Sequence, residues 1–230
     1  MQTLGAVVVS EHADLLESLL IWIRATKLFD QIVVIADTKG GPGTEYVARI
    51  LADTVEVMDV PHQGAVLDHV FSLCTTDWVF RIDDDERMGV NFVSGVKDLV
   101  ETSKYDVYKF PRYWLWPDEN HYIGNGCWSN DQDRQIRLWK NGSVYSSGGI
   151  HVDLLTTPSA RTAFDIIDWR IFHYILVHNS YSERLEKVAR YAALYNESLE
   201  KHRSWVGQFY LPEDATNLLT LPCKEKPWTQ

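Results

Sequence analysis

The chain has 230 residues, of which 45% are hydrophobic and 23% are charged, and its formal net charge is −10 at pH 7. This composition is that of a folded globular protein and excludes a disordered chain. The acidic balance argues against broad binding to a phosphate backbone, which needs clustered lysine and arginine, so we expect no nucleic-acid partner. The three cysteines are far apart and odd in number, which gives no disulfide framework and favours a reducing compartment.

No apolar run in the sequence approaches the roughly 20 residues that a membrane-spanning helix needs. The first residues, "MQTLGAVVVSEH", also lack the basic region and long apolar core of a signal peptide. We therefore expect no transmembrane segment and a cytoplasmic location.

The first half of the chain alternates between short β-branched runs and helical patterns, which predicts parallel strands joined by crossover helices. Asp14 and Glu17 are placed as a capping box for the first helix. We expect strands at residues 4–10, 31–37, 55–60, 77–83, 106–111 and 134–140, and helices at residues 15–29, 45–53, 64–74 and 91–103.

Two segments of the second half stand out. Residues 112–133 are rich in aromatic and polar side chains, and a loop of this length favours a binding role over an idle connection. The alternative is an excursion that packs on the sheet. Residues 180–202 predict a helix with Ser180 and Glu183 as a capping box. Its apolar stripe is expected at Leu185, Val188, Ala192, Tyr195 and Leu199.

Acidic residues follow several of the predicted strands. Glu11 follows the first strand, Asp37 ends the second, and Asp83, Asp84 and Asp85 end the fourth. Ligands of open α/β sheets bind at the carboxyl ends of the strands. Crowded carboxylates oppose folding unless a cation or a hydrogen-bond donor offsets them. These acids therefore predict a divalent-cation site.

The geometry of that site follows from strand alternation. If residues 83–85 stay extended, Asp83 and Asp85 project to the same side and share one ion or its waters, while Asp84 points away. Oxygen ligands favour Mg2+ or Mn2+. The alternative is an acidic turn that solvates its charges, with Asp84 as a cap and Glu86 paired with Arg87.

Five stretches of the sequence together resemble family 2 glycosyltransferases of the GT-A fold. They are "VVVSEHADLLESLL", "IVVIADTKGGPGT", "TTDWVFRIDDDERM", "DRQIRLWKNGSVYSSGGIHVDL" and "HNSYSERLEKVARYAALY". The resemblance implies an α/β fold: a single GT-A-like, Rossmann-related domain over residues 1–230, with a mixed, mostly parallel central sheet flanked by helices. Residues 1–110 would form the nucleotide-sugar-binding half, residues 111–179 the acceptor and metal-site half, and residues 180–230 the C-terminal helix and tail.

The resemblance also implies an activity. A metal-dependent, inverting glycosyltransferase would move a sugar from a nucleoside-diphosphate sugar to a glycan or another hydroxyl acceptor, with Mn2+ or Mg2+ as cofactor. Asp37 would lie near the base or ribose, and Glu11 would line the nucleoside pocket. Asp83 would meet the ribose or a metal-bound water, with Asp84 beside it, and Asp85 would be the direct metal ligand. The family's usual acidic and serine residues after Asp37 are replaced by "TKGGPGT", so the resemblance does not specify the base.

Further candidates come from the second half of the chain. Arg134 and Arg137 are placed to contact the diphosphate or, equally, to pair with Asp131 or Asp133. His151, which follows two glycines that permit close approach to a ligand, is a candidate metal or phosphate contact. We expect His173 and His178 to be structural, with His178 the better functional candidate of the two.

Inversion needs a general base on the face opposite the departing diphosphate. The candidates are Asp131, Asp133 and Asp153. Asp153 is favoured because it follows His151 by two residues, while Asp131 and Asp133 belong to the aromatic loop.

Two other function classes remain open from the sequence. A metal-dependent nucleotidyltransferase or phosphohydrolase also places carboxylates at strand ends, and a non-catalytic nucleotide-sugar-binding module could keep the fold. The Walker and dinucleotide-binding glycine motifs are absent, which disfavours common ATPase and dehydrogenase functions.

Overall fold

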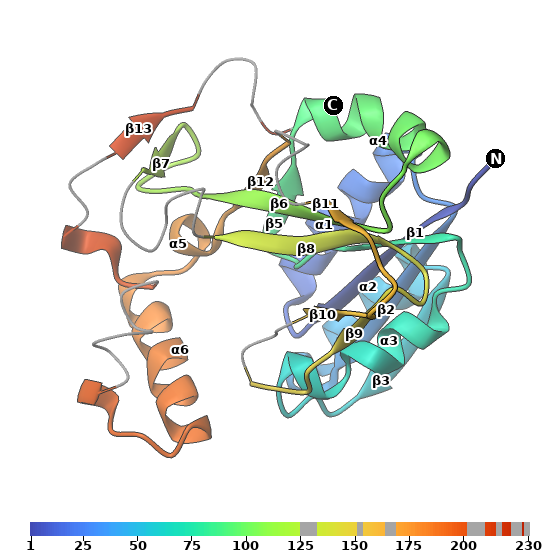
Figure 1. Cartoon of the computed structure of the whole chain (residues 1–230). Coiled ribbons are helices and arrows are strands. Elements are labelled where there is room, and N and C mark those ends of the chain that lie inside the picture. Colours follow the sequence, from blue (N-terminus) through green and yellow to red (C-terminus); the bar gives the residue numbers. More distant parts are fainter. Residues whose placement is uncertain are drawn as a thin grey trace.

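A computed structural model describes residues 1–124, 133–150, 154–163, 169–201, 210–214, 218–221 and 227. Its centre is a mixed sheet with helices on both faces (Figure 1). In spatial order the described strands are β3 (Thr54–Met58), β2 (Gln31–Asp37), β1 (Leu4–Ser10), β4 (Trp78–Arg81), β8 (Arg134–Lys140), β6 (Val107–Trp114), β12 (Ile171–His173) and β5 (Glu86–Met88), with β11 (Thr162–Ala163) beside β6.

The first four strands in this order run parallel, so their carboxyl ends meet at one edge. Strand β8 is antiparallel to both β4 and β6, and β12 runs parallel to β6. Two small sheets lie outside the central one: β9 (Val144–Ser146) pairs with β10 (Leu154–Thr156), and β7 (His121–Ile123) pairs with β13 (Leu218–Thr220).

Alternation along the buried strands divides the core into two layers. Ala6 and Val8 of β1 face the helices α1 (Ala13–Thr26), α2 (Gly41–Leu51) and α4 (Val90–Thr102), whereas Val7 and Val9 face α3 (Leu67–Leu73). Full burial of each large aliphatic side chain stabilises the fold by roughly 1.5–3 kcal/mol. Because both faces are covered, the strands read as continuous apolar runs.

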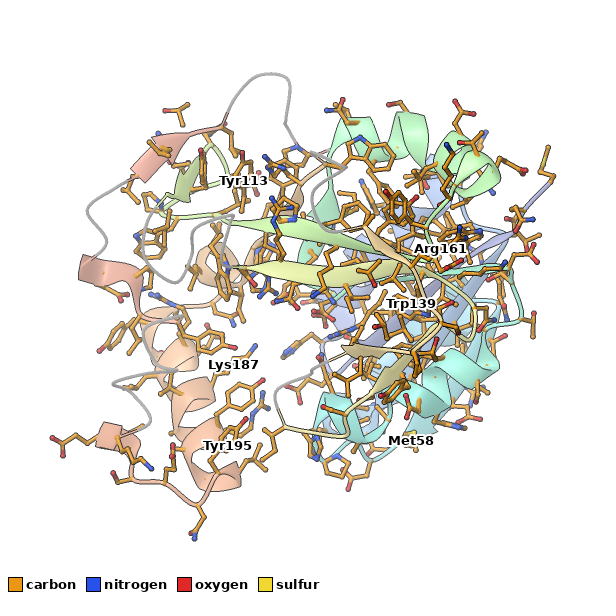
Figure 2. The ribbon with its side chains drawn as sticks, viewed as in Figure 1. Met58, Tyr113, Trp139, Arg161, Lys187 and Tyr195 are labelled. Atoms are coloured by element: carbon orange, nitrogen blue, oxygen red, sulfur yellow. The ribbon has the colours of Figure 1, made fainter. Side chains whose placement is uncertain are left out.

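The chain leaves the sheet through β12 into α5 (Ile175–His178) and α6 (Tyr181–Leu194). Figure 2 places Lys187 on the side of α6 that faces the sheet. Short 3-10 turns are η1 (Thr38–Gly40), η2 (Gln63–Ala65) and η5 (Pro212–Asp214). None of the described helices is both long and apolar enough to cross a bilayer.

Several predicted boundaries are confirmed. The strands at residues 4–10, 31–37 and 134–140 have the predicted ends. The capping box of Ser180 and Glu183 is also present at the start of α6.

Other local predictions are wrong. His12 is the N-cap of α1, without a side-chain bond, so Asp14 and Glu17 do not form the predicted box. Helix α2 begins at Gly41, within the predicted turn, because a proline near the first position is compatible with a helix start. Helix α6 ends at Leu194, which leaves Leu199 outside the predicted stripe.

The fourth strand also ends early. Strand β4 stops at Arg81 instead of reaching Asp83, and residues 84 and 85 form a turn that leads into β5. The extended geometry expected for Asp83 to Asp85 is therefore wrong. In the predicted loop at residues 112–133, β6 continues to Trp114 and β7 follows, while residues 125–132 lie outside the described part of the chain.

Candidate active site

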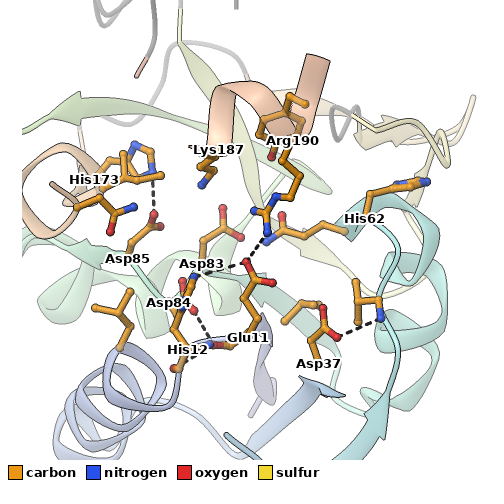
Figure 3. A pocket seen from close by; sticks show the side chains of 18 of the residues that line it. Glu11, His12, Asp37, His62, Asp83, Asp84, Asp85, His173, Lys187 and Arg190 are labelled. Carbon is orange, nitrogen blue, oxygen red and sulfur yellow. Dashed lines mark hydrogen bonds and ion pairs between the residues drawn. The ribbon is translucent and has the colours of Figure 1, made fainter. Parts of the chain in front are cut away.

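A cavity of about 580 Å³ lies at the carboxyl ends of β1, β2 and β4, and α6 forms its opposite wall. All five carboxylates predicted from the strand ends line this cavity (Figure 3): Glu11, Asp37, Asp83, Asp84 and Asp85. Of the two predicted arginines, Arg137 contributes to the described wall and Arg134 does not. The fold thus brings together residues that lie as far apart in the sequence as Glu11 and Arg137.

Glu11 connects the end of β1 to α6. Arg190 Nη1 donates to Glu11 Oε1 at 3.0 Å. Burial alone would raise the pKa of Glu11, but the hydrogen bond and charge of Arg190 outweigh burial and lower it. Glu11 is therefore a charged group in the cavity wall.

Asp37 organises the turn after β2. Its Oδ1 accepts hydrogen bonds from the backbone N–H groups of Lys39 and Val60, at 3.0 and 3.3 Å. Its Oδ2 lies 3.5 Å from Lys39 Nζ. At Gly40 the backbone packs against the Glu11 carbonyl, where a Cβ would overlap the oxygen. Gly40 thus allows the ends of β1 and β2 to meet closely.

Asp83 is held by two buried arginines. Arg81 Nη2 donates to Oδ1 at 2.7 Å, and Arg137 Nη2 donates to Oδ2 at 2.8 Å. Burial alone would raise the pKa of Asp83, but the charges of Arg137 and Arg81 hold it well below its usual range. Arg137 also donates to the fully buried Glu86 at 2.6 Å, so the orientation of Asp83 is fixed from behind.

Asp84 lies in the cavity wall and accepts a hydrogen bond from the Ser10 hydroxyl. Burial, together with the negative charge of Asp85, raises the pKa of Asp84 to about 8.

Asp85 faces His173, which is the last residue of β12. The His173 Nε2 lies 3.3 Å from Asp85 Oδ2, and both side chains are almost fully buried. Burial alone would raise the pKa of Asp85, but the charge and hydrogen bond of His173 hold it well below its usual range. The imidazole packs edge-on against Trp114, with ring centroids 4.2 Å apart.

The pair of Asp85 and His173 fits a divalent cation. Ligand atoms about 2.1 Å from one ion, in near-octahedral geometry, lie about 3 Å from each other, which is close to the observed spacing. His173 Nε2 is the ring nitrogen directed at Asp85, and the other nitrogen, Nδ1, has no hydrogen-bond partner among the described residues. No set of three His, Cys, Asp or Glu side chains suited to a metal is found in the same residues. Two protein ligands suffice for Mg2+ or a similar ion, because it usually keeps several waters and binds substrate phosphates.

Asp133, a predicted general-base candidate, is instead surrounded by donors. It accepts hydrogen bonds from Arg112 Nε at 2.8 Å, from Gln135 Nε2 at 2.7 Å, and from Trp114 Nε1. Burial alone would raise its pKa, but the charge of Arg112 lowers it to about 2. Such a carboxylate is a poor proton acceptor at neutral pH and an effective anchor between β6 and β8.

Three predicted residues, Asp131, His151 and Asp153, lie outside the described residues. Ile150, which directly precedes His151, lines the cavity.

Sequence reasoning missed several residues that line the cavity. His173 was expected to be structural because it stands in an apolar run. The signal for Lys187, Arg190, Tyr191 and Leu194 was available, because their spacing places them on one helical face. The missed residues also include Ser10, Arg81 and Arg112.

The sequence matches no protein-family model and no curated protein. Among solved structures, residues 1–349 of TarS from S. aureus superpose with a TM-score of 0.51 and 9% identity, over 83% of this chain and 65% of that one. The chain has a GT-A-like glycosyltransferase fold. The predicted α/β fold class is therefore confirmed, while the assignment to family 2 stays a prediction.

Two further structures are similar over about half of the chain. Mannosyl-3-phosphoglycerate synthase from Rubrobacter xylanophilus is 26% identical, with a TM-score of 0.42 over 54% of this chain and 43% of that one. Glucosyl-3-phosphoglycerate synthase from Mycobacterium tuberculosis, in complex with Mn2+, UDP and glucosyl-3-phosphoglycerate, is 18% identical, with a TM-score of 0.40 over 50% and 45%. The chain thus spans 43 to 65% of the length of these three proteins.

Proposed function

We propose that this chain is a metal-dependent glycosyltransferase that moves a sugar from a nucleoside-diphosphate sugar to a hydroxyl of a glycan or another acceptor, with inversion. The observation that supports this function best is the meeting of Asp85 and His173 in a cavity whose other acids come from the ends of β1, β2 and β4. In open α/β sheets this edge binds the ligand.

The metal is assigned to Asp85 and His173, with Mn2+ or Mg2+ as the ion. A mixed oxygen and imidazole set suits Mn2+, and both ions use phosphate oxygens as further ligands. When bound, the ion neutralises negative charge that develops on the departing diphosphate. His173 takes the place beside Asp85 that the sequence suggested for Asp83, and His151 remains a candidate for an additional contact.

The nucleoside is assigned to the side of the cavity formed by Glu11 and Asp37. Asp83 is suited to accept a ribose hydroxyl, since each of its oxygens receives one guanidinium bond and keeps a further lone pair. Asp37 orders the turn that carries Lys39, and this turn would border the base.

The general base is assigned to Asp153, with Asp131 as the alternative. The contacts of Asp133 with Arg112 and Trp114 disfavour it as the base. Inversion requires one displacement, in which the base removes the acceptor proton on the face opposite the diphosphate.

A panel of nucleotide sugars, each with Mn2+, Mg2+ or EDTA, tests the proposal. A ligand at a hundred times its dissociation constant adds about 2.7 kcal/mol to stability, so a thermal-shift screen identifies the donor. Product analysis then separates the function classes. A glycosyltransferase releases nucleoside diphosphate and transfers or hydrolyses the sugar, a nucleotidyltransferase or phosphohydrolase cleaves a phosphate bond, and a non-catalytic module binds without turnover. No response to any donor with either metal would reject the proposal.

A further inference from the structure

Helix α6 presents a second, polar face to the cavity. Lys187, Arg190, Tyr191 and Leu194 line the cavity at helical spacings of three and four residues. The neighbouring face is buried through Arg184, Val188 and Ala192. Figure 3 shows Lys187 and Arg190 reaching from α6 toward the carboxylates of the strand ends. The helix is therefore a wall of the site with cations on its inner side.

Lys187 differs from the other lysine and arginine side chains that line the cavity. Lys39, Arg81, Arg112, Arg137 and Arg190 each lie within 3.5 Å of a carboxylate oxygen. Within the described residues, Lys187 forms no such ion pair, and its Nζ lies 5.2 Å from the centre of the Tyr210 ring. Lys187 lines the same cavity as Glu11, Asp84 and Asp85. An ammonium group with three hydrogen-bond donors is thus available to a ligand.

The segment of α6 that carries Lys187 is anchored on both sides. The buried Arg184, one turn earlier, donates to the Tyr210 carbonyl at 3.0 Å and to Glu213 at 2.6 Å, which holds the Tyr210 segment against α6. Arg190, one turn later, is tied to Glu11. Because both neighbours are anchored, the helix that carries Lys187 loses little conformational freedom when Lys187 binds an anion.

We propose that Lys187 binds the diphosphate of the donor, opposite the pair of Asp85 and His173. This inference rests on the proposed function. Lys187 and Asp85 line the same cavity, and Figure 3 shows the Lys187 side chain reaching from α6 toward the strand-end carboxylates where the diphosphate would contact the metal. The ammonium then adds charge neutralisation on the oxygens that become negative as the sugar leaves. The alternative ligand of the Lys187 ammonium is an anionic group on the acceptor.

The experiment measures the binding of UDP, GDP, CDP and ADP, and of the matching nucleosides, by calorimetry with Mn2+. The variants are Lys187→Met and Lys187→Arg, with Lys104→Met as the matched control, because Lys104 is exposed and does not line the cavity. Lys187→Met removes a charged hydrogen-bond donor, and this loss should raise the dissociation constant for the nucleoside diphosphate about 10- to 100-fold. Nucleoside binding should stay unchanged, Lys187→Arg should recover part of the loss, and Lys104→Met should match the wild type.

The outcomes separate the inference from the proposed function. If the wild type binds no nucleoside diphosphate with Mn2+ or Mg2+, both fail. If the wild type binds one and Lys187→Met binds it equally well, only the inference fails. An accompanying rise in KM for an anionic acceptor would then assign the ammonium to the acceptor. Melting temperatures check folding, and Lys187→Gln replaces the methionine variant if that variant is destabilised.

Discussion

Glu11, directly after β1, and Arg190 on α6 form an ion pair at 3.0 Å, although they lie 179 positions apart in the sequence. The pair joins the edge of the sheet to the helix that forms the opposite wall of the cavity. Both partners keep some contact with solvent, since 25% of the Glu11 side chain and 52% of the Arg190 side chain are exposed. We therefore expect the ion pair to hold α6 in position more than to raise the free energy of unfolding.

Arg190→Gln tests this role. Exposed ion pairs contribute about 0–1 kcal/mol, so the free energy of unfolding should change by no more than that. The dissociation constant for the donor nucleotide should rise several-fold, because α6 and Lys187 are less firmly held. Arg49→Gln is the matched control, since it removes an exposed ion pair with Glu45 on α2, away from the cavity. Equal ligand affinity in the two variants would contradict the role of Arg190.

Asp85→Asn and Asp84→Asn should have unequal effects. Asp85→Asn should keep the fold and lose most metal-dependent activity, because an uncharged amide oxygen is a poorer ligand for a hard cation. Asp84→Asn should be milder, because Asp84 accepts a hydrogen bond from the Ser10 hydroxyl and an asparagine amide oxygen can accept the same bond. Mn2+ affinity by calorimetry and initial rates measure both. Similar losses in the two variants would show that Asp84 also acts as a charged ligand.

His173→Gln should match Asp85→Asn in metal binding. The imidazole is nearly fully buried beside Asp85, and glutamine cannot place a nitrogen donor with the same lone pair at that point. We expect weaker Mn2+ binding and lower activity, with part of the activity restored at high Mn2+. His178→Gln is the control, because His178 does not line the cavity. Unchanged Mn2+ affinity in His173→Gln would leave only a structural role for this histidine.

Asp133 should make stability depend on pH. Its folded pKa of about 2 lies below the ordinary value of 3.8, so the stabilisation is complete above pH 4 and is lost as the pH falls toward 2. The shift corresponds to about 2 kcal/mol, since each pKa unit is about 1.4 kcal/mol. Denaturant unfolding should show that Asp133→Asn loses stability at pH 7 and loses less at pH 3. Asp59→Asn, at a side chain 72% exposed, should show no such difference.

The sequence predicted the parts of this site that depend on local order. Glu11 directly follows β1, Asp37 ends β2, and Asp85 lies in the turn after β4, and parallel strands necessarily bring such ends to one edge. It did not predict the partners that arrive from elsewhere. His173 stands in an apolar run, and only the pairing of β12 with β5 and β6 brings it to Asp85. Likewise, Asp133 meets Arg112 because β6 and β8 pair. The residues around Asp133 and Arg112 in the sequence do not indicate this contact.

The last prediction concerns Asp153 and His151, which lie outside the described residues; in the sequence they come just after Ile150, which lines the cavity. Asp153→Asn should leave donor binding unchanged and lower transfer by roughly 10²–10⁴-fold, because a general base typically contributes that much. His151→Ala should instead weaken donor and metal binding together, as expected for a contact to the metal or phosphate. Calorimetry and initial rates separate the two effects. A loss of only a few-fold in Asp153→Asn would move the base to Asp131, and a lower melting temperature with unchanged donor affinity in His151→Ala would make that histidine structural.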